Sequence, residues 1–442
     1  MDLGNKDYTR RSFLKNAMVG AGMASLPLWF AKEATAAEAE VAFRRPKRFG
    51  PNDTLNFAVI GPGGSKGGFR QGLGVSRYIH SQEGAHFVAA CDVDGLHRQE
   101  AADTFGEDTR QYADYREMLA KEDLDAVVIG TPDHWHSAIS IAAMDAGLDV
   151  YCEKPLTLAI AQGRAISWAA TKNGAVFQTG SQQRSNGRFR LACELVRNGR
   201  LGKLKKVTTH LPTGPTGGPF EGVPVPDDLD YNMWLGPAPV NPYCKERTHG
   251  SFRWWLDYSG GMLTDWGAHH NDIAQWGMGT DGGGPRSVYG TAMMPSGVSQ
   301  YHYTTFPEYD LYFDYGNGVT LHCTNQGENG VTFEGEEGWI FVSRGRIEAS
   351  DQALLDAPLP ADAVRLYVSD GHALNFLDCI RTRKQPICNA EVGHRSVSVC
   401  HMANICLRLG GRQLNWDADS ERFLADEEAN GMLDRPAREW EE

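Results

Sequence analysis

The sequence lacks the motifs and the charge that several large classes of protein require. None of its nine cysteines belongs to a Cys-x-x-Cys pair, which excludes the spacing of a zinc ribbon or a thioredoxin-like redox motif. A formal charge of -13 provides no basic face for nucleic acid or an anionic membrane. Internal repeats and low-complexity tracts are also absent, so a solenoid is not expected.

The composition that is present is ordinary for a large globular protein. Apolar residues make up 41% of the 442 residues, and charged residues make up 22%. A chain of this length can form two domains, each with its own core. We therefore expect two folded domains and a small-molecule ligand.

The first forty residues carry the pattern of an export signal. Thr9-Arg10-Arg11-Ser12-Phe13-Leu14-Lys15 precedes a moderately apolar run, and Ala34-Thr35-Ala36-Ala37 offers a small-residue cleavage site. The apolar run is short and contains glycine, unlike a membrane span. We interpret residues 1–37 as a twin-arginine signal peptide and expect a periplasmic or otherwise exported protein without a stable membrane anchor. The alternative is a basic helix that stays attached.

A strand, a glycine turn, a helix and a second strand are then predicted in that order. Leu55–Ile60 runs directly into Gly61-Pro62-Gly63-Gly64, and the strand predicted at 86–92 ends in Asp92. In a dinucleotide-binding unit, such glycines let the backbone approach a pyrophosphate and the acid accepts hydrogen bonds from a ribose diol. The acid favours NAD over NADP. The third glycine, Gly67, comes one residue later than the usual spacing. The alternative interpretation, a flexible loop that binds no ligand, is therefore kept.

Alternation of strands and helices continues through the first part of the chain. Apolar runs at 126–129 and 149–152 predict two more buried strands, and the pattern at 135–146 predicts a helix between them. This alternation is typical of an α/β fold with a doubly wound parallel sheet. We predict a Rossmann dinucleotide-binding domain over residues 52–177.

The pattern changes after residue 178. Alternating runs flank the turn Gly316-Asn317-Gly318 and predict a β-hairpin, and another strand is predicted at 338–342. We predict an α+β domain with a largely antiparallel sheet over residues 178–442, ending in a helical tail. Its open sheet offers a surface on which a homo-dimer or a tetramer could form.

Two groups of residues could carry chemistry. Lys154, in Glu153-Lys154-Pro155, follows a predicted strand, beyond whose carboxyl end a bound dinucleotide is expected. Taken alone, this tripeptide is better explained as a solvated charge pair before a strand-ending proline. Asp265, His269 and Asp272 share one face of a helix if it begins near Thr264, and a carboxylate beside an imidazole can orient it as an acid or base. A capped helix with a buried histidine is one alternative. A metal site is another, although it lacks a fourth ligand nearby, and we expect no metal.

These motifs, in this order, resemble the glucose-fructose oxidoreductase, inositol dehydrogenase and MocA (Gfo/Idh/MocA) family. The similarity runs from about Asn56 to Leu409 and rests on Gly61-Pro62-Gly63-Gly64, Thr131-Pro132-Asp133-His134-Trp135-His136, Glu153-Lys154-Pro155, and Gly260-Gly261 followed by Asp265, His269 and Asp272.

The resemblance implies a role for each motif residue. It implies that Lys154, Asp265 and His269 are catalytic, the lysine touching the substrate hydroxyl and the pair assisting proton transfer. It implies hydride transfer between a nicotinamide and a sugar carbon, C3 of a hexose being the expected position. The residues implied to bind the cofactor are Gly61, Gly63, Gly64, Asp92, Thr131, Pro132, His136, Glu153, Lys154 and Pro155.

Aromatic and charged side chains between residues 234 and 258 suit a sugar. Aromatic rings pack against the apolar faces of sugars, and charged groups bind hydroxyls. The predicted substrate contacts are Arg184, Tyr243, Arg247, Arg253, Trp254 and Asp272. The alternative is that these aromatic residues form a core or an oligomer interface.

Three functions remain open at this point. The first is an exported sugar or glycoside oxidoreductase that keeps NAD tightly bound, because free NAD is scarce outside the cytoplasm. The second is an NAD-dependent glycoside hydrolase that acts by transient oxidation and elimination. The third is a non-catalytic periplasmic sugar-binding protein. The lysine favours the first over the second, and the complete set of Lys154, Asp265 and His269 argues against the third.

Overall fold

A computed structural model of the chain describes residues 50, 53–295, 297, 299–438 and 440. The predicted signal peptide, residues 1–37, lies outside these residues. No helix within the described part of the chain combines the length and the apolar character that a membrane span needs.

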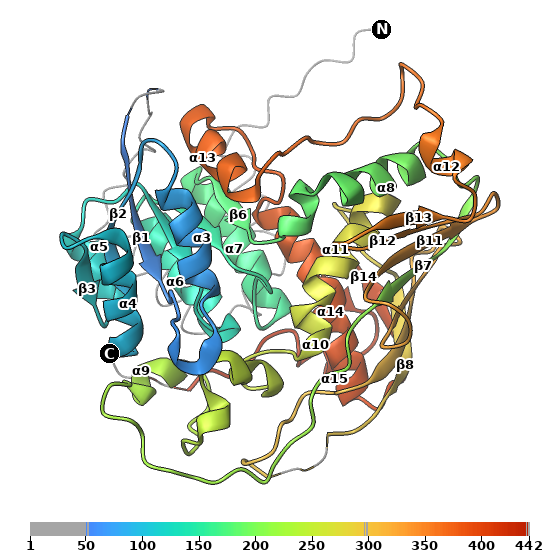
Figure 1. Cartoon of the computed structure of the whole chain (residues 1–442). Helices are drawn as coiled ribbons and strands as arrows, with labels where there is room; N and C mark the ends of the chain where they lie inside the picture. Colours follow the sequence, from blue (N-terminus) through green and yellow to red (C-terminus); the bar gives the residue numbers. More distant parts are fainter. Residues whose placement is uncertain (1–49, 51–52, 296, 298, 439, 441–442) are drawn as a thin grey trace, which may run out of the picture. The chain divides into compact units, whose positions relative to one another are not determined.

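The first sheet contains six parallel strands (Figure 1). They are β1 (Leu55–Ile60), β2 (Ala85–Cys91), β3 (Arg110–Tyr112), β4 (Ala126–Ile129), β5 (Asp149–Cys152) and β6 (Phe177–Thr179), in the spatial order β3-β2-β1-β4-β5-β6. The strand order reverses between β1 and β4, and a dinucleotide binds beyond the carboxyl ends of the strands at such a reversal. The predicted doubly wound Rossmann sheet is confirmed.

Helices connect these strands and cover the sheet. They are α3 (Gln71–His80), α4 (Gly95–Phe105), α5 (Tyr115–Lys121), α6 (Asp133–Asp145) and α7 (Ile160–Asn173). Two begin at aspartate caps: Asp94 accepts hydrogen bonds from the first turn of α4, and Asp114 from that of α5. Helices on both faces explain why β4 and β5 are buried along their whole length.

A helix from the far end of the sequence completes this first core. α13 (His372–Thr382) lies beside α3 and buries Phe376, Leu377 and Ile380 in the same apolar cluster as Phe57 (Figure 1). This helix lies within residues 178–442, the range predicted for the second domain. The dinucleotide-binding half of the protein therefore contains a segment far outside residues 52–177.

The second sheet has nine strands in the order β13-β12-β11-β7-β10-β9-β8-β14-β15. They are β7 (Leu204–His210), β8 (Ser287–Ala292), β9 (Tyr309–Asp314), β10 (Thr320–Thr324), β11 (Gly330–Gly335), β12 (Trp339–Val342), β13 (Ile347–Ala349), β14 (Leu414–Asp417) and β15 (Arg422–Phe423). All its pairs are antiparallel except β7 with β10. The predicted hairpin is present as β9 and β10, and the largely antiparallel sheet is confirmed.

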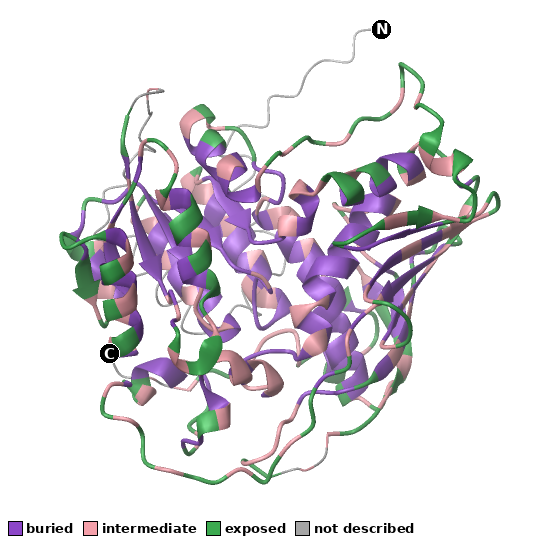
Figure 2. Cartoon of the chain, viewed as in Figure 1, coloured by how far each residue is buried: buried purple, intermediate pink, exposed green. Residues whose placement is uncertain are grey.

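The second core lies between this sheet and three helices. They are α8 (Gly187–Arg197), α11 (Gly267–Met278) and α14 (Ala390–Arg408). Figure 2 shows α11 and α14 almost entirely buried. The shorter helices are α9 (Tyr231–Leu235), α10 (Met262–Asp265), α12 (Ala353–Asp356), α15 (Glu427–Asn430), and the 3-10 turns η2 (Lys66–Gly68), η3 (Gln182–Ser185), η4 (Lys245–Arg247) and η5 (His249–Trp254). Because α11 is buried, its polar side chains must have internal partners or face a cavity.

Candidate active site

The glycine turn after β1 has no room for side chains. Gly61 has φ +69°, and a Cβ there would lie 2.6 Å from the backbone nitrogen of Thr131. Gly63 has φ +65°, and a Cβ there would lie 2.4 Å from the carbonyl oxygen of Phe69. Both the backbone conformation and the space therefore require glycine.

The third glycine of this turn differs from the one expected. Gly67 lies in η2, inside an insertion that is closed by a hydrogen bond from Gly64 N to Phe69 O (3.0 Å). Gly72, in the first turn of α3, takes its place, since a Cβ there would lie 2.6 Å from Gly61 O. Close packing of helix on strand is the task of the third glycine in a dinucleotide-binding turn. The insertion explains why the sequence spacing was misleading.

A cavity opens at this turn, where a bound dinucleotide is expected. Gly61, Gly63, Asp92, Thr131 and Pro132 line it, as predicted residues of the cofactor site. No side chain caps the N-terminus of α3, which leaves its partial positive charge available to a phosphate. The buried Thr131 Oγ1 has no hydrogen-bond partner within the described residues. A pyrophosphate requires backbone donors at a helix N-terminus and glycines that leave room for it, and a ribose requires an acid such as Asp92. The cavity offers all three.

The five other predicted cofactor residues, Gly64, His136, Glu153, Lys154 and Pro155, do not line this cavity. Gly64 and Pro155 lie outside it, and His136 is buried beneath it. The ring nitrogens of His136 lie 2.9 Å from the carbonyl oxygens of Pro155 and Thr131, and burial lowers its pKa to about 4. His136 therefore ties together the two loops that carry the site, which corrects the expectation that it lies along the cofactor.

A second cavity, of about 230 Å³, adjoins the first and contains the predicted catalytic residues. Phe69, Gly130, Thr131 and Phe252 line both cavities. The other residues that line the second cavity are Gln71, Asp133, Glu153, Lys154, Gln182, Arg253, Asp265, Trp266, His269 and Arg344. Residues from the ends of β4 and β5 thus meet residues from the second domain around one space.

Lys154 and Asp265 form an ion pair at this cavity. Lys154 Nζ lies 2.5 Å from Asp265 Oδ1 and 3.1 Å from the carbonyl oxygen of the same residue. Arg253 Nε lies 3.4 Å from Asp265 Oδ1. Burial alone would raise the pKa of Asp265, but the positive charges of Lys154 and Arg253 lower it to about 2. Asp265 is therefore ionised, and it holds the lysine ammonium in position.

His269 has a different environment from the one expected. The sequence predicted that Asp265 would orient it, but no hydrogen bond joins the two residues, because Asp265 is engaged by Lys154 and Arg253. His269 Nδ1 is buried and has no hydrogen-bond partner in the described part of the chain. Burial, with the charges of Lys154 and Arg344, holds the pKa of His269 well below its usual value. The ring is therefore neutral at neutral pH, and it can accept a proton or a hydrogen bond from a ligand.

Glu153, the residue before the lysine, is held in place by hydrogen bonds. Its carboxyl group is buried and accepts hydrogen bonds from Gln182 Nε2 (2.9 Å) and Gln71 Nε2 (3.4 Å). Burial raises its pKa above the usual range. A side chain at Gly180 would collide with this carboxyl group. Glu153 thus fixes the strand end that presents Lys154.

Arg184 and Asp272 were predicted to contact the substrate, but they contact each other. Arg184 is 2% exposed and Asp272 is not exposed at all. The guanidinium donates to the carboxylate at 2.7 to 3.0 Å, and Ser396 Oγ adds a hydrogen bond of 2.5 Å to Asp272. Neither residue lines either cavity. In this structure both residues belong to the core rather than to a cavity wall, because a buried arginine needs an internal anion.

The predicted aromatic wall of the substrate site is largely a core. Tyr243 is buried among apolar side chains. Arg247 is fully buried, with its guanidinium 3.9 Å from the centre of the Trp255 ring and a bond to the carbonyl of Pro242. Trp254 lines neither cavity. Of the six predicted substrate contacts, Arg253 alone lines the second cavity.

Asp133, which was not predicted as a site residue, lines the second cavity. Its ionisation should make the stability of the fold depend on pH. It is 3% exposed, it accepts a hydrogen bond from Ser259 Oγ (2.5 Å), and burial raises its pKa to about 7. The folded protein therefore keeps this proton up to about pH 7, whereas an unfolded chain releases it near pH 4. The free energy of unfolding should fall as the pH rises between these values.

The variant Asp133→Asn tests this expectation. Between pH 5 and pH 8 the wild type should lose about 2–3 kcal/mol more stability than the variant, as measured by chemical unfolding at both pH values. Replacing the exposed Asp108 in the same way should leave the wild-type pH dependence unchanged. Equal pH dependence in wild type and Asp133→Asn would show that the carboxyl group ionises normally.

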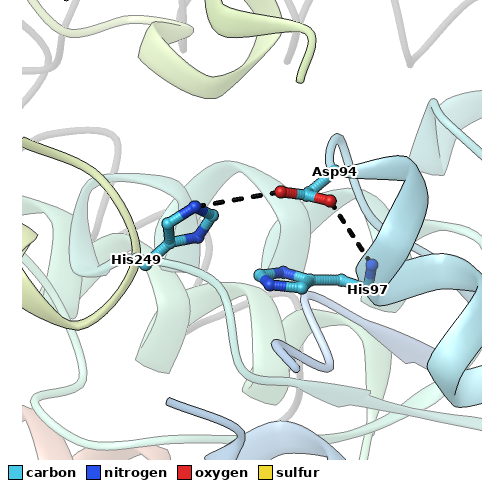
Figure 3. A group of neighbouring side chains, drawn as sticks. All are labelled: Asp94, His97 and His249. Carbon is cyan, nitrogen blue, oxygen red and sulfur yellow. Dashed lines mark hydrogen bonds and ion pairs between the residues drawn. The ribbon is translucent and has the colours of Figure 1, made fainter. Parts of the chain in front are cut away.

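Asp94, His97 and His249 form a group that could hold a cation, at the edge of the first cavity (Figure 3). Their ligand atoms all lie within 4.8 Å of one another. However, Lys66 Nζ lies 3.2 Å from Asp94 Oδ2 and 2.5 Å from Asp228 Oδ2. An ammonium group thus supplies the positive charge that a metal ion would bring. Because Asp228 and His249 belong to the second domain, the group joins the two halves beside the cofactor cavity.

Comparison with known proteins agrees with this architecture. The profile of the Gfo/Idh/MocA oxidoreductase family, NAD-binding Rossmann fold, matches residues 55–181. The profile of the same family's C-terminal alpha/beta domain matches residues 213–442. The Bordetella pertussis WlbA dehydrogenase, solved in complex with NADH and UDP-GlcNAcA, has a similar fold. Its TM-score is 0.59 at 20% identity, with coverage of 83% of this chain and 100% of that chain.

Curated relatives match over shorter stretches. An inositol 2-dehydrogenase of Salmonella typhimurium is 27% identical over 128 residues, which is 29% of this chain and 38% of the relative. Glycosyl hydrolase family 109 protein 2 of Shewanella sp. (strain ANA-3) is 29% identical over 218 residues, which is 45% of this chain and 44% of the relative. The chain thus matches less than half the length of each of these relatives. The two family profiles cover most of the sequence, and they follow each other along the chain in the same order as the two sheets. The chain therefore belongs to the Gfo/Idh/MocA oxidoreductase family.

Proposed function

We propose that the protein is an exported NAD-dependent oxidoreductase that transfers hydride between the nicotinamide and a hydroxyl-bearing carbon of a sugar or glycoside. One observation carries this proposal. The ion-paired Lys154 and the neutral His269, whose Nδ1 has no hydrogen-bond partner among the described residues, line one cavity, and that cavity adjoins the one above the glycine turn. Groups that can handle a hydroxyl proton thus lie next to the place where a dinucleotide fits.

The residues of the second cavity can divide the work of alcohol oxidation. A bound nicotinamide supplies the group that accepts or returns the hydride. His269 is neutral and can accept the hydroxyl proton, and the Lys154 ammonium can stabilise negative charge that develops on the oxygen. Asp265 holds the lysine in place and does not itself accept a proton, since the pKa of Asp265 is about 2.

The residues around the first cavity support the proposal that the cofactor is retained. Leu229, Met233, Trp234 and His249, all from the second domain, line it opposite the glycine turn. Lys66, in the inserted loop, reaches across to Asp228. A dinucleotide enclosed by both domains would leave slowly, as an exported enzyme requires. Asp92 at the end of β2 favours NAD over NADP in this site.

The relative in glycosyl hydrolase family 109 makes a second function worth testing. In a redox glycosidase, the same cavity would oxidise a glycoside transiently, eliminate the aglycone and return the hydride. That reaction needs no external acceptor and would use the same proton-handling groups. The two functions differ in net redox change, which can be measured directly.

The test uses the purified protein with whatever nucleotide it carries. Heat release should yield NAD from the folded protein. Incubation with a panel of free sugars and aryl glycosides should then change the absorbance of reduced nicotinamide without releasing aglycone. Aglycone release without net absorbance change would replace the proposal with the glycosidase reaction. Absence of both, with sugar binding intact, would overturn the enzymatic function.

A further inference from the structure

The ion pairs around the second cavity leave one cationic side chain without a partner. Three cationic side chains line it, namely Lys154, Arg253 and Arg344, and Asp265 pairs with the first two. The two other carboxyl groups are those of Asp133, which accepts a hydrogen bond from Ser259, and Glu153, which accepts hydrogen bonds from Gln71 and Gln182, and neither forms an ion pair with these cations. The result is an imbalance of one cation that no carboxylate of the cavity pairs with.

Arg344 is the source of this imbalance. It lies in the turn between β12 and β13, and no carboxylate pairs with it anywhere in the described residues. Arg346, two residues later, has the opposite situation, because it pairs with Glu328 and Glu348, each at 2.6 Å. An arginine in this turn can therefore find carboxylate partners, and Arg344 has none.

The guanidinium of Arg344 is nevertheless held in place. Its central carbon lies 4.6 Å from the centre of the Trp266 ring, a favourable cation–π distance. The side-chain amide of Gln183 lies between Arg344 and His269. In the orientation that gives both of its polar atoms a partner, its oxygen accepts a hydrogen bond from Arg344 Nε (3.2 Å) and its nitrogen donates one to the carbonyl oxygen of His269 (3.2 Å). Trp266 and Gln183 thus contact the face of the guanidinium and its Nε atom, while the residue itself is exposed. Its two terminal nitrogens remain for a ligand beside His269.

We propose that these two nitrogens bind an anionic group on the substrate, so that the substrate class is acidic sugars, which bear a carboxylate or a phosphate. This inference rests on the proposed function and narrows it. A guanidinium fork matches the paired oxygens of either group, and such charge-assisted pairs are among the stronger hydrogen bonds. A fixed fork binds at lower entropic cost than a mobile one.

Equilibrium binding to the holoprotein provides the test, since it does not depend on turnover. One arm compares D-glucuronate and D-galacturonate with their methyl esters, and a second arm compares glucose 6-phosphate with glucose. In at least one arm the acid should bind about 10- to 100-fold more tightly than its neutral counterpart, as measured by calorimetry. The arm that shows the preference identifies the anionic group.

Two variants assign the preference to a residue. Arg344→Gln should remove the preference for the acid, and Arg344→Lys should retain part of it, because lysine keeps the charge but not the fork. Arg346→Gln is the matched control and should keep the full preference, since its partners lie outside the cavity.

The outcomes separate this inference from the proposed function. Equal binding of acids and neutral counterparts, no binding of any acid, or a preference that survives Arg344→Gln would each overturn it. Turnover of neutral sugars without any preference for acids would remove this inference and leave the oxidoreductase proposal standing. A preference for acids without any redox change would support this inference and remove the oxidoreductase proposal.

Discussion

Lys154→Ala is expected to lower kcat by about 10³-fold while NAD remains bound. The ammonium lines the second cavity together with His269, and Arg253 is not expected to replace it, since its guanidinium carbon lies 3.7 Å from the centre of the Phe69 ring. Steady-state kinetics on the sugar that the panel identifies, together with the nucleotide content of each preparation, provide the measurement.

The variant has a second consequence that serves as an internal control. Without the lysine, the buried Asp265 carboxylate keeps a single cationic partner, Arg253, at 3.4 Å, so burial should raise its pKa. Lys154→Met combined with Asp265→Asn should therefore be folded and also inactive. Lys205→Ala, an exposed lysine on β7, should have wild-type kinetics. An unchanged kcat in Lys154→Ala would remove the lysine from the mechanism.

Asp272→Ala is expected to destabilise the protein by about 3–5 kcal/mol. The substitution leaves Arg184 buried, with its bidentate partner gone and a more exposed aspartate, Asp281, as its remaining anion. Removing one member of a buried ion pair is far more costly than removing an exposed one. Thermal and chemical unfolding of the holoprotein measure the effect.

Matched variants distinguish a structural pair from a substrate contact. Glu328→Ala breaks an exposed pair with Arg346 and should cost less than about 1 kcal/mol. The double variant Arg184→Met with Asp272→Leu should recover part of the lost stability, because no charge stays buried without a partner. If Asp272→Ala raised KM with wild-type stability, the original interpretation of Asp272 as a substrate contact would return.

The fold was largely predictable from local sequence patterns. β1, β4 and β5 were recognised because each is a short apolar run, and in the structure both faces of these strands are covered by helices. β3 was missed, since Arg110-Gln111-Tyr112 is short and largely exposed and carries no apolar pattern. The parallel pairing of β7 with β10 was also missed, because it joins segments more than a hundred residues apart.

The site was predictable only in part, for a physical reason. Lys154, Asp265 and His269 were found because each belongs to a compact motif. Their pairing was not, because the partner of Asp265 lies 111 residues earlier in the chain. The same aromatic and arginine residues make a sugar-binding wall or a well-packed core, so composition could not exclude Tyr243 or Arg247.

Arg344 carried no signal that separates it from any other arginine in a turn. What distinguishes it is its place on the wall of the second cavity, against Trp266 and without a carboxylate partner among the described residues, and this place becomes visible only when the neighbouring residues are placed in space. Gln71, Gln182 and Trp266 line the cavity for the same kind of reason. Each is an ordinary residue in sequence and becomes part of a site through contacts from distant segments.

The position of α13 determines when the first domain can finish folding. Phe376 and Ile380 complete the apolar cluster around Phe57, but they are synthesised more than three hundred residues after it. A nascent chain that ends before His372 would present an uncovered apolar surface on the first sheet, which invites aggregation or chaperone binding. Dinucleotide binding should therefore begin only after nearly the whole chain has left the ribosome.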